Sequence, residues 1–130
     1  MKRSRSKYFA KKVKVNGEIY DSTKEYKRYR ELLLLEKAGA ITDLQKQVKF
    51  VLIPTQYETY ERYGKNGKRL KDGKRLLERE VAYIADFVYF ENGKKVVEDT
   101  KGYKKGTAYD LFTLKRKLML SVHGIRVREI

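Results

Sequence analysis

The 130-residue sequence contains no cysteine and no tryptophan, and it has one histidine and one proline. Because cysteine is absent, a disulfide scaffold, a thiolate zinc site and a cysteine nucleophile are excluded. A single histidine also excludes metal sites built from several imidazoles and leaves little room for histidine-driven acyl transfer. These absences remove much of zinc and acyl-transfer chemistry from the functions open to the chain.

Long hydrophobic runs are absent too, since no apolar stretch approaches the roughly 18–20 residues that a membrane-spanning helix needs. The first residues, MKRSRSKYFAKK, carry the charge of a signal-peptide start, but no apolar segment follows them. The length fits one domain, and a hydrophobic content of 41% is enough for a core. We therefore expect an intracellular, cytoplasmic protein with one folded domain and no membrane partner.

What the sequence has in excess is positive charge: 32 lysines and arginines stand against 17 acidic residues, for a net charge of +15. Like charges crowded on a small surface repel one another, and a bound polyanion relieves that repulsion while it releases its own counterions. Nucleic acid is therefore the expected partner. The alternatives are a merely basic domain and an anionic membrane surface, although the basic residues are scattered rather than aligned on one helix.

The N-terminal part of the chain divides into an unpatterned segment and the start of a folded unit. Residues 1–12 are expected to form a basic flexible arm, and residues 13–130 a single domain. Asn16-Gly17, between two alternating segments, predicts a β-hairpin because both residues tolerate a positive φ.

A first helix is predicted from Ser22 to about Ala38. Ser22 and Glu25 have the spacing of a capping box, and Gly39 supplies a C-terminal stop. The apolar stripe of this helix consists of Tyr26, Tyr29, Leu32 and Leu33.

The middle of the chain combines a strand with a basic insertion. Residues 46–53 alternate well enough for a strand that Pro54 ends. Residues 64–77 are rich in glycine and positive charge, and they predict a flexible, protruding hairpin or loop. The candidates for nucleic-acid binding in this insertion are Lys65, Lys68, Arg69, Lys71, Lys74 and Arg75. Nearby tyrosines either stack on bases or pack within the protein: Tyr57, Tyr60 and Tyr63.

Residues 80–90 and 94–101 predict two further strands, joined by a tight turn at Asn92-Gly93. The chain continues with a basic loop, a second helix and a last strand. The basic loop at residues 102–106 adds the nucleic-acid-binding candidates Lys104 and Lys105.

The second helix is expected to start with a cap formed by Thr107 and Asp110 and to end at Gly124. Residues 125–130 predict the last strand. The apolar residues expected on this helix include Leu111, Leu114, Leu118 and Val122. The order hairpin, α, β, β, β, α, β predicts an α/β (α+β) domain, in which helices flank a mixed β-sheet.

The predicted tight turn determines which residues of the last two antiparallel strands face each other. In such a two-residue hairpin Glu91 pairs with Lys94. Counting back along both strands, Asp86 then lies opposite Asp99, with Cβ atoms roughly 4.5–5.5 Å apart. Two acids at that separation repel each other, and a divalent cation that prefers oxygen ligands removes the repulsion. Lys101 lies on the same face of the hairpin.

Other interpretations of this hairpin stay open. The register can differ from the predicted one, or Lys95 and Lys101 can simply neutralise acids at the surface. A bulge can also turn Glu98 toward Asp86 in place of Asp99, since bulges reverse the side-chain alternation locally.

Four short segments carry these residues: YDSTKE at 20–25, LQKQVKF at 44–50, YIADF at 83–87 and VEDTKG at 97–102. In this combination the chain resembles the PD-(D/E)xK nuclease superfamily, most closely a small phage and prophage group of nuclease-like proteins. It is similar in plan to phage and archaeal Holliday junction resolvases. The resemblance covers most of the chain beyond its first residues. It departs at two positions. Ala85 stands where the motif has proline, and Asp99 stands where glutamate is commoner.

The resemblance implies a restriction-endonuclease-like αβββαβ core and metal-dependent hydrolysis of phosphodiester bonds. Asp86, Asp99 and the Thr100 carbonyl would bind Mg²⁺ or Mn²⁺. Glu25 would complete the site, and Lys101 would orient the attacking water and stabilise the charged transition state. A divalent cation suits this reaction because it acidifies water and neutralises charge on the phosphoryl oxygens.

Several of these residues also have a structural explanation. Glu25 is accounted for by its helix cap alone, and Gln47 either contacts the site or has a structural role. Lys115 and Lys117 bind phosphate or belong to a solvated basic face. His123, beside the glycine that ends the second helix, is expected to cap that helix rather than act as a base.

Together these features predict a Mg²⁺-dependent DNA endonuclease of phage recombination, replication or packaging, for which branched DNA such as a Holliday junction is a candidate substrate. Its basic segments, with Lys115, would contact phosphates without reading sequence. A homodimer is expected if junctions are the substrate, because symmetric cutting of two strands needs two active sites. The alternatives are a non-catalytic nucleic-acid-binding module that keeps the nuclease fold and an RNA-binding protein.

Overall fold

The computed structural model describes residues 12–15, 18–20, 23–102 and 104–130. Within these ranges the chain forms β1 (Val13–Val15), β2 (Glu18–Tyr20), α1 (Thr23–Lys37), β3 (Thr42–Ile53), β4 (Gln56–Tyr63), β5 (Arg69–Glu78), β6 (Val81–Glu91), β7 (Lys94–Asp99), α2 (Thr107–His123) and β8 (Arg128–Glu129). Most of the expected basic arm, the Asn16-Gly17 turn and the Ser22 cap lie outside the described residues. The strands on either side of that turn do pair antiparallel, as the hairpin prediction requires.

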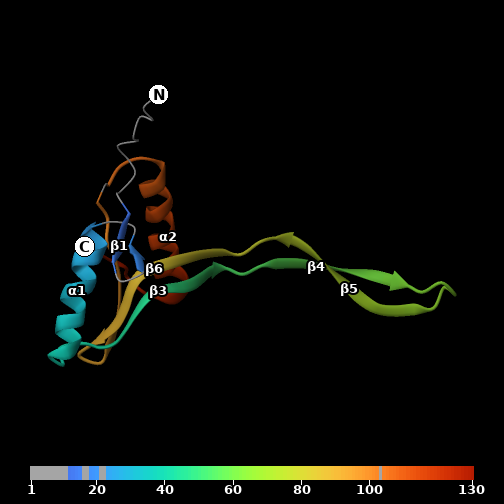
Figure 1. Ribbon diagram of the computed structural model, residues 1–130. Helices are drawn as coiled ribbons and strands as arrows, with labels where there is room; N and C mark the ends of the chain where they lie inside the picture. Colours follow the sequence, from blue (N-terminus) through green and yellow to red (C-terminus); the bar gives the residue numbers. More distant parts are fainter. Residues whose placement is uncertain (1–11, 16–17, 21–22, 103) are drawn as a thin grey trace.

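A four-stranded mixed sheet organises the fold, with the strand order β3-β6-β7-β8. Its first three strands are antiparallel neighbours, whereas β8 runs parallel to β7 after the α2 connection. The helices α1 and α2 lie on either side of this sheet (Figure 1). The prediction of an α+β fold with a mixed sheet flanked by helices is therefore confirmed. The sheet and helices follow one another as α, β, β, β, α, β, with β4 and β5 inserted after β3.

The core consists of two apolar clusters, one under each helix. Under α1 the buried residues are Leu32, Ile41, Phe87 and Tyr89. Under α2 the buried residues include Phe50, Val88, Val97, Phe112 and Met119. Phe87, Val88 and Tyr89 alternate between the two faces of the sheet, as the two-residue period of a strand requires. Tyr83 and Ala85 pack under α2 instead, so the alternation shifts between Ala85 and Phe87.

The β6–β7 hairpin has the predicted register. Asn92 and Gly93 both have a positive φ, of 52° and 75°, as a two-residue turn of type I′ demands. Strand pairing joins Glu91 to Lys94 and continues to the pair of Phe87 with Glu98. The register was therefore predicted correctly from the turn alone.

Glu98 lies on the α1 side of the sheet, where it is fully buried. Arg28 of α1 donates two hydrogen bonds to it, from Nε to Oε1 at 2.7 Å and from a terminal nitrogen to Oε2 at 3.0 Å. The Tyr89 hydroxyl donates a third at 2.7 Å. Because these donors satisfy Glu98 on the α1 side, the hypothesis that it replaces Asp99 in a carboxylate pair is wrong.

Both helices extend about as predicted, but not all of their apolar residues are buried. In α1, Leu32 is buried and Tyr29 stacks on Phe87 with ring centroids 5.9 Å apart, but Leu33 is exposed. In α2, three of the apolar residues named above are at least half exposed: Leu111, Leu114 and Val122. Two sets of α2 residues recur at helical spacing, so periodicity alone does not say which set faces the sheet.

The ends of α2 were predicted with mixed success. Gly106 occupies the N-cap position, and no side chain among the described residues caps this end, so the Thr107 cap was wrong. Gly124 ends the helix with φ 67°, as predicted. His123 does not cap its own helix, because its Nε2 donates to the Val51 carbonyl at 2.7 Å.

The β4–β5 arm, residues 56–78, contains the basic segment at residues 64–77 that was expected to form a protruding hairpin or loop. Within the part of the chain that the structure describes, its two strands pair only with each other, and they extend away from the sheet and helices (Figure 1). Tyr60 covers Gly73 on the opposite strand so closely that a Cβ atom there would lie 2.4 Å from its ring. The Arg75 guanidinium lies 4.7 Å from the centroid of the same ring. Most of the predicted loop is therefore strand, covered on one face by an aromatic side chain and a cation.

No helix among the described residues combines the length and the apolar character that a membrane crossing requires.

The ion pair between Arg28 and Glu98 yields a prediction for stability. The variant Arg28→Leu leaves Glu98 charged and buried, so the free energy of unfolding should fall by about 3 kcal/mol. The double variant Arg28→Leu/Glu98→Leu should recover most of that loss, because two apolar side chains of similar volume replace the pair. Urea unfolding measures both values. A loss below about 1 kcal/mol in the single variant would contradict the assigned role.

Candidate active site

Two carboxylates meet where β6 and β7 lie side by side. Asp86 comes from the middle of β6 and Asp99 ends β7, and Asp99 is only 3% exposed. Their carboxyl groups lie within hydrogen-bonding reach of each other. The backbone N–H and the hydroxyl of Thr100 both donate to Oδ2 of Asp86, at 2.9 and 2.8 Å. The structure thus brings together the two acids that the hairpin register placed opposite each other, and we call them the carboxylate pair.

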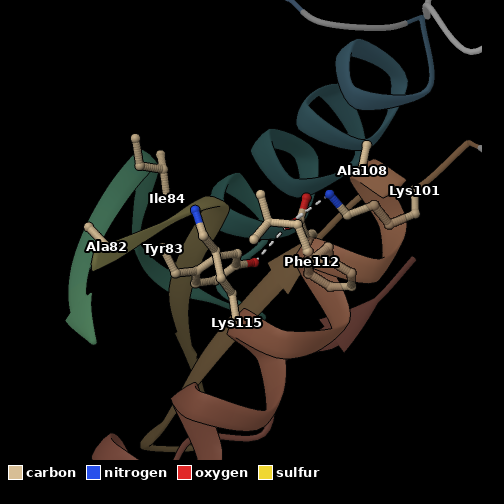
Figure 2. Close-up of a pocket in the computed structure, with 9 residues that line it drawn as sticks. Ala82, Tyr83, Ile84, Lys101, Ala108, Phe112 and Lys115 are labelled. Carbon is tan, nitrogen blue, oxygen red and sulfur yellow. Dashed lines mark hydrogen bonds and ion pairs between the residues drawn. The ribbon is translucent and has the colours of Figure 1, made fainter. Parts of the chain in front are cut away.

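Two further groups converge on Asp99. The Tyr83 hydroxyl donates to its Oδ2 at 2.8 Å, and Lys101 Nζ lies 3.3 Å from the same oxygen. Figure 2 shows the Tyr83 hydroxyl and the Lys101 amine pointing toward this carboxylate. The Lys101 amine also lies 4.2 Å from the centroid of the Phe112 ring, close enough for a cation–π interaction. Lys101 is thereby held between a carboxylate and an aromatic face.

The carboxylate pair is electrostatically strained. Burial, together with contact and charge repulsion from Asp86, raises the pKa of Asp99 to about 8, although Lys101 and Tyr83 act in the opposite direction. Burial and the neighbouring Asp99 likewise raise the pKa of Tyr83 far above its ordinary value. At neutral pH the Asp99 carboxyl therefore holds its proton in most molecules, and a bound cation would favour its ionised form.

Glu25 reaches this region from the first turn of α1 and is 4% exposed. Gln47 of β3 connects it to the carboxylate pair, because its Nε2 donates to Glu25 Oε1 at 3.0 Å and lies 3.5 Å from Asp86 Oδ1. Gln47 has a φ of 52°, a left-handed conformation that is unfavourable for a residue with a side chain. Backbone strain of this kind is concentrated at functional sites, where surrounding structure holds it in place.

The segment that carries Asp99 and Lys101 is fixed from both sides. The N–H of Ile130, just after β8, donates to the Asp99 carbonyl at 2.9 Å. On the other side, Lys24 of α1 donates from Nζ to the Lys101 carbonyl at 2.9 Å. The first helix and the last strand, which are far apart in the sequence, therefore position one short segment.

The donor set fits a divalent cation of the Mg²⁺ type in part. Mg²⁺ commonly takes only one or two carboxylates from a protein and keeps several waters, and the carboxylate pair supplies two. Among the described residues, however, no three side chains of histidine, cysteine, aspartate or glutamate form a group that would hold a metal ion. Glu25 is connected to the pair through Gln47, so direct ligation by Glu25 and by the Thr100 carbonyl stays a prediction.

The remaining predicted residues lie in different places. Lys115 lines a cavity beside Asp99. Lys104 Nζ lies 3.7 Å from a Glu129 oxygen, and Lys105 is exposed. The basic residues predicted on the arm lie on β5 or in the turn before it, and the arm extends away from the sheet and helices (Figure 1). Some of them pair within the arm, such as Arg75 with Glu58 at 3.2 Å.

Sequence reasoning missed Tyr83, Phe112 and Lys24. Simple strand alternation places Tyr83 on the face opposite to Asp86, so its contact with Asp99 was not expected. Phe112 fits either a core or a site position on α2, and nothing in its sequence neighbourhood distinguishes the two. Lys24 stands beside Glu25 in the YDSTKE segment, which was the one available signal.

Fold and site together define an α+β protein with a carboxylate pair and an adjacent lysine at the junction of two antiparallel strands. The chain belongs to the family described as "Protein of unknown function (DUF1064)", whose model matches residues 5–125. No curated protein and no solved structure matches the chain.

Gln47 offers a test of backbone strain. The variants Gln47→Ala and Gln47→Gly both remove the amide that bonds to Glu25, so their difference isolates the backbone. Because glycine adopts a positive φ freely, the free energy of unfolding of Gln47→Gly should be about 1 kcal/mol higher than that of Gln47→Ala. At an ordinary strand position the alanine variant is the more stable of the two. If urea unfolding shows that order here, the backbone of Gln47 is not strained.

The raised pKa of Asp99 predicts how the metal-free protein responds to pH. Between its ordinary value of about 4 and about 8, the folded state holds a proton that the unfolded state has released. The free energy of unfolding should therefore fall as pH rises through this range, by at most about 1.4 kcal/mol per pH unit. Asp99→Asn should remove this component and be the more stable protein at pH 8 in EDTA. Parallel pH profiles of the two proteins would contradict the prediction.

Proposed function

We propose that the protein is a metal-dependent DNA endonuclease of the PD-(D/E)xK type, which hydrolyses phosphodiester bonds with Mg²⁺ or Mn²⁺. The observation that supports this most strongly is the contact between the Asp86 and Asp99 carboxyl groups with the Lys101 amine beside them. A buried acid beside a second, partly buried acid is costly in a protein that only binds an anion, because carboxylates also repel phosphate. A cation bound between the two carboxyl groups during function would offset this cost.

The chain's own residues would have distinct parts in this reaction. The carboxylate pair would hold the cation, which supplies Lewis acidity toward the phosphodiester. Thr100 keeps Asp86 oriented through two hydrogen bonds. Lys101 would place its ammonium group against the phosphoryl oxygens, where negative charge develops in the transition state. Phe112 and Asp99 hold that ammonium group in position before the substrate arrives.

Substrate binding would depend on charge outside the site. The net charge of +15 favours a polyanion, and the β4–β5 arm carries seven of the 32 lysines and arginines. Its ten-residue strand β5 extends about 30 Å, long enough to follow a nucleic-acid backbone or to enter a groove. The two most exposed tyrosines of the arm, Tyr57 and Tyr63, offer aromatic faces to a partner.

Branched DNA is the candidate substrate in phage recombination, replication or packaging, and a homodimer would place two active sites for symmetric cutting of a junction. A second candidate function is a non-catalytic nucleic-acid-binding module. It is favoured by one observation, namely that the described residues form no group of three potential metal ligands from histidine, cysteine, aspartate and glutamate.

Cleavage of labelled linear, flapped and four-way DNA, with Mg²⁺ or with EDTA, tests the proposal. Wild type should cut in Mg²⁺ only. Asp86→Asn and Asp99→Asn should each lower the rate by more than about 100-fold, since each removes a ligand of the cation that activates the reaction. DNA binding by these variants, measured by fluorescence anisotropy, should be unchanged or tighter, because a negative charge near the phosphates is lost.

The control variant is Asp43→Asn, an equal change of charge at an exposed residue of β3 whose positive φ of 55° asparagine also tolerates. It should cut like wild type. Equal cutting by all proteins would assign the activity to another site or to a contaminant. DNA binding without any cutting in Mg²⁺ or Mn²⁺ would leave the non-catalytic module as the function.

A further inference from the structure

An open cavity of about 290 Å³ lies next to the carboxylate pair. Its lining combines three sources: strand β6 with Ala82, Tyr83 and Ile84, the end of β7 and its following segment with Asp99 and Lys101, and helix α2 with Ala108, Leu111, Phe112 and Lys115. Figure 2 shows these side chains around the hollow. The four α2 residues have the spacing of one helix face, so a single side of α2 forms one wall.

The walls of this cavity are unusual for the border of a charged site. Ile84 is 55% exposed and Leu111 is 52% exposed, although both lie beside a buried carboxylate and a lysine. Exposed apolar side chains in a concave site mark the place of an apolar ligand group. A phosphate alone would need only the two lysines and would leave these walls uncovered.

The positive charge of the cavity indicates a second property of its ligand. Lys101 and Lys115 both line the cavity, and their side chains reach it from different sides in Figure 2. A ligand that satisfies both features has an apolar group next to anions. Within a polynucleotide, that description fits one nucleobase with the phosphates on either side of its sugar.

We propose that this cavity, which we call the base pocket, receives a single unstacked nucleobase of the nucleotide adjacent to the scissile phosphate. The inference rests on the proposed function and deepens it by defining the substrate. A volume of about 290 Å³ is at the lower end of small-ligand sites and suits one nucleoside rather than a stacked base pair. The preferred substrate is therefore DNA with an unpaired base next to the cut, as at a flap or a branch point, where unstacking costs least.

In the base pocket, residues outside the carboxylate pair have roles in binding the nucleotide. Leu111 and Ile84 contact the faces of the base, and Lys115 binds the phosphate on the side away from Lys101. Ala108 leaves room for the base, because a larger side chain at this position of the same helix face would fill the hollow.

Binding in EDTA tests the pocket without any cutting. The probe is a fluorescent duplex with a single-stranded flap, compared with the same DNA in which an abasic site replaces each flap nucleotide nearest the branch point in turn. Stacking of one base on a protein surface contributes about 1–3 kcal/mol, so wild type should bind one of the abasic probes about tenfold or more weakly.

Two pocket variants and one matched control complete the test. Ala108→Phe fills the hollow and Leu111→Ser removes an apolar wall, so both should bind intact and abasic probes equally. Leu114→Ser makes the same change at a similarly exposed leucine of α2 that does not line the cavity, and it should discriminate like wild type. Thermal melting identifies any variant that fails to fold. If one pocket variant does not fold, binding by the other pocket variant tests the proposal.

The outcomes separate this inference from the proposed function. Equal binding of every probe by wild type, together with Mg²⁺-dependent cutting, would overturn the base pocket and leave the endonuclease proposal intact. Discrimination that depends on Ala108 and Leu111, without cutting in Mg²⁺ or Mn²⁺, would support the pocket and overturn the endonuclease. Absence of DNA binding would overturn both.

Discussion

The close approach of two carboxyl groups, Asp86 and Asp99, is the constraint on which the rest of the structure depends. Burial and mutual repulsion raise the pKa of Asp99 to about 8, so the pair is unfavourable when both groups are charged. Every neighbouring contact either holds the pair together or moderates its charge. Thr100 donates two hydrogen bonds to Asp86, and Tyr83 and Lys101 approach Asp99.

Stability for this arrangement comes from the opposite face of the sheet. Glu98, the residue before Asp99, points to α1 and is bound there by Arg28 and Tyr89. A charge-assisted, fully satisfied network of this kind fixes the register of β7 and the position of α1 together. Since Glu25 lies one turn before Arg28 on that helix, the same network also determines where Glu25 meets Gln47. The site is thus built from a favourable ion pair on one face and an unfavourable acid pair on the other.

The features of the fold and site that could be predicted from the sequence are those that depend on residues close together in the chain. The Asn92-Gly93 turn gave the hairpin register, and with it the contact between Asp86 and Asp99, because register propagates residue by residue from a turn. The composition and element order were likewise enough for the α+β class. Local signals did not determine the orientation of α2, where Phe112 and Met119 rather than Leu111 and Leu114 face the sheet. Nor could they give the left-handed backbone of Gln47, which only tertiary contacts maintain.

The basic insertion was another partial success. Its glycines and lysines indicated a protruding segment, but they did not show that Tyr60 packs over Gly73 and that most of the insertion is paired strand. Cross-strand packing of an aromatic side chain on a glycine depends on register between residues thirteen positions apart, which no short motif encodes. The exposed residues of this arm and of the cavity beside Asp99 are where the fold leaves surface available for a partner.

The most direct measurement is an anomalous difference map from a crystal grown or soaked with Mn²⁺. The account predicts a peak between the Asp86 and Asp99 carboxylates, at the 2.0–2.2 Å or so that oxygen ligands of such ions adopt, and no peak there in Asp86→Asn crystals. Carboxylates that turn away from each other in Mn²⁺, or a well-ordered map without density between them, would contradict it.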